Sequence, residues 1–341
     1  MKKSHITIHD IAKELNISAS TVSRALQDNP RISALTRTAV RDLALKYNYQ
    51  PNVLASSLRK GQGNTVGVII PRINRNFFAN VIGGMEEVLS DAGFNMMICQ
   101  TYEKFEKEEA AVQTLINARV NAIIMSLSME TRTAEHISQL KHRNIRLLFF
   151  DRTSDLVKSS SVTVDDEEGA YLAVKHLIDN GYKKIAHIAG AEHINIYRNR
   201  KNGYLKAMKE SGIEVKRNWI MHHSLILEGG KEAFNILSSW EDRPDAVFCA
   251  GDYAALGIIS AAKQEKVRIP DDLGVVGFSN EPFTEFIEPS LTSVDQKGEE
   301  MGRMVANQFL TQSMYNIDEE IIEKRIIQPT LLIRKSSLKN H

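Results

Sequence analysis

Apolar runs of strand length alternate with helical patterns from Thr65 onward, over about 275 residues. The expected strands are residues 65–71, 95–101, 121–127, 146–151, 160–165, 184–190, 245–251 and 274–279, and helices are expected between most of them. Continuous apolar strands with helical crossovers indicate parallel sheets that are covered on both faces. This length exceeds one comfortable domain. We therefore expect a core of two similar α/β lobes, each a doubly wound parallel sheet.

The first fifty residues are patterned differently, as three short helices. Apolar residues recur at helical spacing over residues 7–15, 19–26 and 33–47, with Thr7, Ser18 and Ser33 placed to cap them. The first two helices have the helix–short turn–helix spacing of a helix-turn-helix. In that motif the second helix enters the major groove of DNA, and its polar residues meet base edges and phosphates. The residues at that position are Ala19, Ser20, Thr21 and Arg24.

The formal net charge of +1 conceals an asymmetry. Residues 1–60 contain ten Lys and Arg against four Asp and Glu, whereas acidic residues are in slight excess in the remainder. A small basic head on a slightly acidic body is typical of a polyanion-binding unit joined to another domain. An uneven but solvated surface would give the same counts, so charge alone does not decide between the two interpretations.

Several classes of protein lack their sequence signals here. No run approaches the ~18 apolar residues that span a bilayer, and no apolar segment follows Lys2 and Lys3 as in a secretory signal. Cys99 and Cys249 are the only cysteines, which favours a reduced cytoplasm. No glycine-rich turn follows the first strand, no GKS/T, HExxH or GxSxG motif occurs, and His222-His223 has no third ligand at metal spacing. We expect a cytoplasmic protein that is not an enzyme and has no membrane segment, cofactor or metal.

Ligands of open parallel sheets bind beyond the carboxyl ends of the strands. Phe77 and Phe78 follow the first strand, where they could stack on a ligand or belong to the core. Asp151 and Arg152 end the fourth strand, where they could bind a ligand or form an internal ion pair. Asp252 follows the strand over 245–251, and capping of the next helix is the preferred interpretation for it.

At the amino end, TIHDIAKELNISASTVSRALQDNPRISALTRTAV and YNYQPNVLASSLRKG resemble the head of the lactose-repressor/galactose-repressor (LacI/GalR) family of bacterial transcription regulators. The likeness continues through TVGVIIP, NFFANVIGGMEEVLSDAGF, DDEEGAYLAVKHLIDNGYKKIAHIAG, GDYAALGIISAAK and DLGVVGFSN. It closes with PSLTSVDQKGEEMG. Because it covers nearly the whole chain in the family's order, it is more specific than any single motif.

The resemblance implies a helix-turn-helix domain (1–50), a hinge helix with a linker (51–63) and an effector-binding and dimerisation core (64–341). The core is expected to be periplasmic-binding-protein-like, with an N-lobe of about 64–164 and 296–324 and a C-lobe of about 165–295 and 325–341. In this family two hinge helices of a homodimer meet on a near-palindromic operator, and each inserts a leucine into the minor groove; Leu58 matches that leucine. The residues then expected to contact DNA are Thr7, Ser18, Ala19, Ser20, Thr21, Ser23, Arg24, Asn29, Tyr49, Asn52, Ala55, Leu58 and Arg59.

Arg200 matches the arginine that reaches the ligand in this family. The residues expected to bind an effector are Arg75, Phe77, Phe78, Asp151, Arg152, Arg200, Gly251, Asp252 and Ser279. This sequence departs from the family where Asn is frequent at 251 and Asp at 279, and where Asn-Pro commonly stands in place of Arg75-Asn76. The missing carboxylate at Ser279 makes a plain hexose less certain. An anionic or phosphorylated sugar would suit Arg75, Arg152 and Arg200, which is a hypothesis.

The expected function is sequence-specific transcription regulation, as a repressor whose operator affinity is controlled by a small molecule. A sugar or sugar derivative bound between the two lobes is the expected effector. One alternative is a DNA-binding regulator whose core only dimerises or binds a partner protein. Another is an exported solute-binding protein, which would share the lobes, but the first sixty residues argue against it.

We expect Leu58→Ala to weaken specific operator binding much more than non-specific DNA binding, because an apolar wedge gains contacts only where the duplex is kinked. Fluorescence anisotropy with operator and random duplexes would measure both affinities. An equal loss on the two duplexes would contradict the wedge role.

Overall fold

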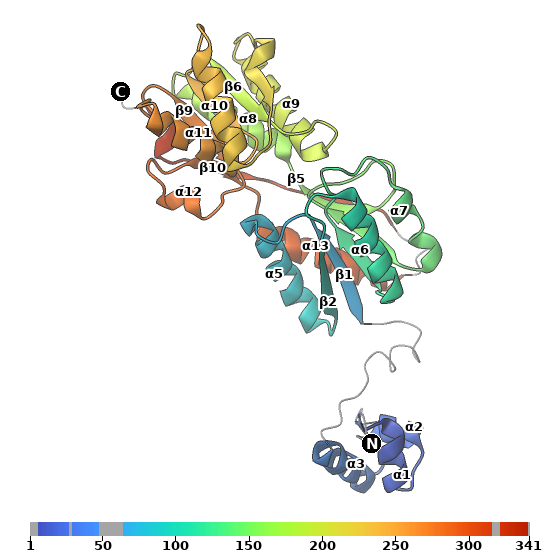
Figure 1. Ribbon diagram of the computed structural model, residues 1–341. Coiled ribbons are helices and arrows are strands. Elements are labelled where there is room, and N and C mark those ends of the chain that lie inside the picture. The colour runs from blue at the N-terminus through green and yellow to red at the C-terminus, as the bar shows by residue number, and fades with distance from the viewer. Residues whose placement is uncertain (1–5, 27–28, 48–63, 316–320, 340–341) are drawn as a thin grey trace. The chain divides into compact units, whose positions relative to one another are not determined.

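The computed structural model describes residues 6–26, 29–47, 64–315 and 321–339 (Figure 1). The chain divides between Gly63 and Asn64 into two compact units. The hinge helix and linker expected over 51–63 lie outside the described residues, as do Tyr49, Asn52, Ala55, Leu58 and Arg59. No helix in the described ranges is both long and apolar enough to cross a membrane.

The amino-terminal unit contains the three expected helices, α1 (Ile8–Glu14), α2 (Ala19–Leu26) and α3 (Ala34–Lys46). Its core consists of Ile11, Ala12, Val22, Ala25, Val40 and Ala44. The expected caps are present. Ser18 and Ser33 accept hydrogen bonds from the backbone N–H groups of Thr21 and Thr36 (3.1 and 3.2 Å), and Thr7 pairs with the carboxylate of Asp10 (2.7 and 2.8 Å). Leu35 is an exception to the helical pattern, because it lies in the first turn of α3 and is 85% exposed.

The first lobe of the core, the N-lobe, is built on a six-stranded parallel sheet with the spatial order β11-β5-β4-β3-β1-β2. Its strands are β1 (Thr65–Ile70), β2 (Asn95–Gln100), β3 (Ala122–Met125), β4 (Arg146–Phe150), β5 (Ser160–Val164) and β11 (Lys324–Ile327). One face is covered by α5 (Asn76–Asp91) and α13 (Gly298–Ser313), and the other by α6 (Phe105–Asn117) and α7 (Glu135–Ser138) (Figure 1). The exposed 3-10 turn η1 (Lys141–Arg143) precedes β4. Val66 and Val68 pack on the first face and Ile69 on the second, which is the period of two expected for a strand buried on both sides.

The second lobe, the C-lobe, repeats this plan with the strand order β12-β10-β9-β8-β6-β7. Its strands are β6 (Ile185–Ala189), β7 (Ile220–His222), β8 (Ala246–Cys249), β9 (Gly274–Phe278), β10 (Thr292–Asp295) and β12 (Thr330–Leu332). Helices α8 (Asp166–Asp179) and α9 (Asn195–Glu210) cover one face, and α10 (Leu227–Ser239) and α11 (Asp252–Gln264) the other. The remaining short elements are α12 (Phe283–Phe286), η2 (Arg217–Trp219) and η4 (Lys335–Ser337). The expected doubly wound parallel sheet is confirmed, and only its short edge strand β12 differs, because it runs antiparallel to β10.

The chain passes between the two sheets three times, after β5, after β10 and after β11. The third passage lies between Ile327 and Thr330 rather than at residue 324, because β11 pairs with β5 and completes the first sheet. Each lobe is therefore assembled from distant parts of the sequence. All three passages connect the same two sheets, so the two lobes are joined to each other by three chain segments.

His187 on β6 is a buried titratable group of the C-lobe. Its ring lies between those of Tyr204 and Phe248, at centroid distances of 5.2 and 4.9 Å. Nδ1 is 3.0 Å from the carbonyl oxygen of Phe248, and Nε2 has no hydrogen-bond partner among the described residues. A neutral ring that donates from Nδ1 suits this site, since protonation would bury an unpaired N–H. Burial lowers the pKa of His187 from its ordinary 6.5 to about 4.

This lowered pKa predicts a loss of stability in acid. In the window between the two pKa values the unfolded chain binds more protons than the folded chain, so the free energy of unfolding falls as the pH drops. His187→Phe removes this titrating group. As the pH falls from about 7 to about 4, the free energy of unfolding of the wild type should therefore fall by up to about 3 kcal/mol more than that of the variant. Urea unfolding measures the difference, with His142→Phe at an exposed histidine as the control. A difference that does not change with pH would contradict the prediction.

Candidate functional site

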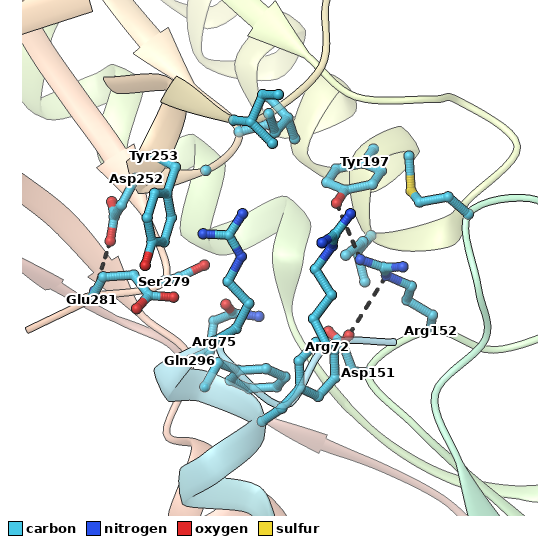
Figure 2. Close-up of a pocket in the computed structure, with 18 of the residues that line it drawn as sticks. Arg72, Arg75, Asp151, Arg152, Tyr197, Asp252, Tyr253, Ser279, Glu281 and Gln296 are labelled. Carbon is cyan, nitrogen blue, oxygen red and sulfur yellow. Dashed lines mark hydrogen bonds and ion pairs between the residues drawn. The ribbon is translucent and has the colours of Figure 1, made fainter. Parts of the chain in front are cut away.

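A cavity of about 290 Å³ lies between the two lobes, beyond the carboxyl ends of both sheets (Figure 2). All nine residues expected to bind an effector lie in its wall. The N-lobe side is formed by Arg72, Arg75, Phe77, Phe78, Glu103, Met129, Asp151 and Arg152. The C-lobe side is formed by Ile196, Tyr197, Arg200, Ser224, Leu225, Ile226, Ala250, Gly251, Asp252, Tyr253, Ser279 and Glu281, and Gln296 follows β10.

Arg200 is held at the C-lobe wall by buried partners and is only 2% exposed. Its Nε donates to the Asp166 carboxylate and its Nη1 donates to the carbonyl of Ala250, both at 2.8 Å. The guanidinium plane lies over the ring of Phe278, 3.7 Å from the centroid. Nη2 lies in the same wall and has no acceptor among the described residues. A buried donor without a partner has an energetic cost that a ligand acceptor would remove.

Arg152 forms the internal ion pair with Asp151 that was one interpretation of the sequence, but its hydrogen-bonded and closer partner is Glu103. Its terminal nitrogens donate to the two oxygens of Glu103 at 2.7 and 3.3 Å. A further bond reaches the carbonyl of Leu127 (3.2 Å), whereas the nearest approach to Asp151 is 3.9 Å. Burial raises the pKa of the Asp151 carboxyl above its usual range, and the charges of Arg152 and Arg200 oppose that shift.

The sequence suggested that Asp252 caps the helix that follows it, but the structure shows that it does not. Gly251 is the N-cap of α11, and the Asp252 carboxylate reaches across to the neighbouring strands. It accepts hydrogen bonds from the hydroxyl of Ser293 (2.7 Å) and the backbone N–H of Glu281 (2.8 Å). Gly277 on β9 makes room for it, because a Cβ there would lie 2.1 Å from Asp252 Oδ1. Burial raises the pKa of Asp252 to about 6, and these hydrogen bonds oppose the shift.

The loop after β9 is fixed by these contacts. Ser279 has a φ of 118°, a conformation that side chains rarely adopt, and its N–H donates to the carbonyl of Val294 (2.9 Å). Two residues further on, Glu281 places a carboxylate in the cavity wall. The pocket therefore contains a carboxylate close to Ser279, where the family comparison led us to expect none.

Aromatic rings form further parts of the wall. Phe77 and Phe78 belong to the N-lobe core and also line the cavity, and their stacking on a ligand stays a prediction. On the other side, Tyr253 lies under the guanidinium of Arg75, 3.6 Å from its carbon to the ring centroid. Tyr197 lies near Arg152, with a hydrogen bond of 3.4 Å from Arg152 to its hydroxyl.

Contacts between the lobes occur at several points around the cavity. The side chain of Asn195 accepts from Thr153 N–H (3.0 Å) and donates to the carbonyl of Asp151 (3.1 Å). Elsewhere, Glu281 accepts from the backbone N–H of Asn76 at 3.4 Å. These contacts span the two lobes, so the arrangement of the lobes and the shape of the cavity depend on each other.

Several residues of this wall were not predicted from the sequence. The residues not expected there include Arg72, Glu103, Tyr197, Tyr253, Glu281 and Gln296. Each lies in a loop beyond a strand or in the first turn of the following helix, so the strand-end rule applied to every strand would have found most of them. Their loops carry no periodic pattern that shows which side chains point inward.

The DNA-facing residues expected on the second helix are partly occupied by local bonds. Ser18, Ser20 and Arg24 are exposed, whereas Ala19, Thr21 and Ser23 are half-buried. The Ser18 hydroxyl bonds those of Ser20 and Thr21 (2.7 and 2.8 Å). Thr7 and Asn29 are used within their own turns, Asn29 by accepting from Arg31 N–H (3.0 Å).

The two units of the chain match two known families. Residues 7–52 match the family described as bacterial regulatory proteins, lacI family, and residues 174–337 match the periplasmic binding protein-like domain. A helix-turn-helix followed by two lobes around a ligand-sized cavity defines a DNA-binding transcription regulator that is controlled by a small molecule.

Relatives across the full length give the family. Catabolite control protein A of Priestia megaterium is 32% identical over 326 residues, which cover 95% of this chain and 96% of that protein. The Lac repressor dimer bound to operator and the anti-inducer ONPF shares the fold, with a TM-score of 0.86 at 22% identity over 98% of this chain and 100% of that one. The complex of the regulator CelR with cellobiose has a TM-score of 0.74 at 24% identity over 97% and 100%. The chain belongs to the LacI family of bacterial regulatory proteins.

The bonds around Asp252 predict a stabilising role for Ser293. Its buried hydroxyl donates to Asp252 and accepts from the N–H of Asn280 (3.0 Å), so Ser293→Ala removes a partner from the buried Asp252 carboxylate and from the half-buried Asn280 N–H. We expect a loss of about 1–3 kcal/mol in the free energy of unfolding. Urea unfolding measures it, and hydrogen exchange at Asn280 and Glu281 should become faster. Ser239→Ala, at an exposed serine that bonds one carbonyl, is the matched control, and an equal effect in both variants would contradict the role.

Proposed function

We propose that the effector is a sugar or a sugar derivative and that it binds between the lobes to control the affinity for a near-palindromic operator. The observation that carries this proposal is the wall of the cavity, which combines aromatic rings, carboxylates and guanidinium groups from both lobes. Polar groups of this kind bond hydroxyls, and rings pack on the apolar face of a sugar. The CelR–cellobiose complex is a relative in fold that binds a sugar.

The roles that we propose follow from the hydrogen-bond donors and acceptors that each group does not use within the protein. Arg200 donates to the ligand from Nη2, its one terminal nitrogen without an acceptor among the described residues. Glu281 accepts from ligand hydroxyls, in place of the carboxylate missing at Ser279. Phe77 and Phe78 pack on the ligand with Tyr253 opposite. Asp151, Arg152, Gly251, Asp252 and Ser279 shape the wall, because their polar groups are largely used within the protein or belong to the backbone.

On the DNA side, we propose that α2 reads the major groove through Ser20, Thr21 and Arg24. The side chain of Arg24 is exposed at the end of the polar face of this helix. The helix-turn-helix match over residues 7–52 supports this assignment. Ser18 both caps α2 and lies beside the backbone N–H groups that can bind phosphate.

We propose a homodimer. The edge strand β2 leaves Met97 and Ile98 exposed, and Phe286 on α12 is 84% exposed. Exposed apolar side chains on a sheet edge favour association, and a second copy would cover them. The Lac repressor structure of the same fold is a dimer on its operator. The relatives are transcription regulators, and we propose that this chain likewise catalyses no reaction and acts in the cytoplasm, where it reaches DNA.

The test begins with an operator selected from a pool of random duplexes, because the duplexes that the chain retains reveal the sequence it binds. Thermal shift of the full chain then screens sugars, sugar acids and sugar phosphates, since a ligand at a hundred times its dissociation constant stabilises by about 2.7 kcal/mol. We expect a stabilising ligand to change operator affinity by about tenfold or more, in line with a coupling free energy of about 1–3 kcal/mol. Fluorescence anisotropy measures that change.

Two variants separate the sites. Arg24→Ala should lose operator affinity and keep the thermal shift with the ligand. Glu281→Gln should keep operator affinity and lose most of the thermal shift, because an amide replaces the accepting carboxylate. A ligand that stabilises the chain and leaves operator affinity unchanged would contradict the proposed control and would favour a core that only binds and dimerises.

A further inference from the structure

Two arginines extend from the loop between β1 and α5 into the cavity. Figure 2 shows the side chains of Arg72 and Arg75 rising from the same wall, with their guanidinium groups in the open space. Both side chains are only half-buried. They are therefore accessible to a ligand and also partly shielded from water, which strengthens an ion pair formed there.

Neither guanidinium has its hydrogen-bonding capacity used within the protein. Arg72 approaches Glu103 only through Nε, at 3.8 Å, which is too long for a hydrogen bond. The guanidinium carbon of Arg75 lies over the ring of Tyr253, 3.6 Å from the centroid, and this contact uses none of the guanidinium N–H groups as hydrogen-bond donors to an oxygen or nitrogen atom. Among the residues that the structure describes, no acceptor forms a hydrogen bond with either group. An arginine offers five N–H donors in a planar fork.

The two other arginines of the cavity do donate hydrogen bonds to groups of the protein. Arg152 has its terminal nitrogens on Glu103, and Arg200 donates to Asp166 and Ala250. Of the three cations that the sequence suggested for an anion, only Arg75 donates no hydrogen bond to a described residue, whereas Arg200 keeps one terminal nitrogen free. Arg72, which the sequence analysis did not select, likewise donates none.

The carboxylates of the cavity do not accept hydrogen bonds from Arg72 or Arg75. Glu103 is bound by Arg152, Asp252 by Ser293 and Glu281 N–H, and Asp151 by the hydroxyl of Ser126 at 3.2 Å. Glu281 faces the N–H of Asn76. Glu103 lies 3.8 Å from Arg72, and the charge of Arg75 acts on Glu281, but among the described residues no carboxylate accepts a hydrogen bond from either arginine.

We infer that the effector carries an acidic group, a carboxylate or a phosphate, and that Arg72 and Arg75 bind this group. The inference rests on the proposed function, since it takes the cavity as the effector site and adds the chemical class of its ligand. A planar carboxylate or a phosphate accepts from two guanidinium edges at once, and a neutral hydroxyl does not replace it. The rest of the ligand would face Arg200, Glu281 and the aromatic rings.

The experiment compares matched ligands on the full chain. Glucose, gluconate and glucose 6-phosphate form one set, and ribose and ribose 5-phosphate form another. Isothermal titration calorimetry gives each dissociation constant at low and high salt. We expect the acidic member of at least one set to bind about tenfold or more tightly than its neutral counterpart, with an advantage that shrinks in high salt. The gluconate and phosphate arms distinguish a carboxylate from a phosphate.

The double variant Arg72→Gln/Arg75→Gln tests the two residues. It should abolish the preference for the acidic member and leave affinity for the neutral sugar within about twofold, because the lost bonds are charge-assisted. Both side chains are half-buried and form no hydrogen bond with the described residues, so the variant should have a melting temperature close to that of the wild type. Arg243→Gln, at an exposed arginine outside the cavity, is the matched control and should change nothing.

Each result separates the inference from the function on which it rests. Neutral sugars that bind as tightly as their acids, and change operator affinity, would overturn the acidic group and leave the proposed function intact. A preference that persists in the double variant would overturn the assignment to Arg72 and Arg75. If no member of either set binds or changes operator affinity, both the inference and the sugar-responsive function are wrong.

Discussion

Parallel strand pairing is the constraint on which the candidate site depends. In a parallel sheet every strand ends at the same edge, so the loops that follow β1 to β4 gather on one side of the N-lobe, and those after β6 to β10 gather on one side of the C-lobe. Because the two edges face each other, residues that are far apart in sequence, such as Arg75 and Tyr253, come into contact. The cavity is formed by loops of both lobes and exists only while the two lobes keep this arrangement.

Buried polar contacts then fix the wall. The Arg200–Asp166 pair and the Arg152–Glu103 pair hold two guanidinium groups in defined positions, and Asp252 holds the loop that carries Glu281. Pairs of this kind are weak evidence for stability, because their desolvation offsets much of their attraction. Their effect on geometry is clearer, since Arg200 Nη2 and the two arginines of the β1–α5 loop are all part of the cavity wall. A ligand meets groups that are already oriented, and this reduces the entropy lost on binding.

Much of this organisation could be predicted from the sequence. Caps and apolar spacing predicted α1, α2 and α3 closely, because local signals determine short helices, and the strand-end rule selected residues that share one cavity. The failures have physical causes. Asp252 was predicted to cap its own helix because sequence distance favours local bonds, whereas its carboxylate is satisfied across β9 and β10. Leu35 follows the apolar spacing but lies in an exposed first turn. β12 has only three residues and pairs antiparallel at an edge, so it carries too little pattern to be predicted. Arg72 lies in an irregular loop, where sequence does not show which way a side chain points.

The positions of β11 and β12 bear on how the chain is synthesised. These two edge strands are close together near the carboxyl terminus, yet one completes the N-lobe sheet and the other the C-lobe sheet. The amino-terminal unit has its own apolar core and is made first, so it can fold during translation, as domains generally do. Neither lobe of the core can finish its sheet until the last segment leaves the ribosome. A nascent chain that stops short of residue 324 would therefore carry an intact DNA-reading unit with both halves of its control domain incomplete, and truncation of one short segment would damage both lobes together.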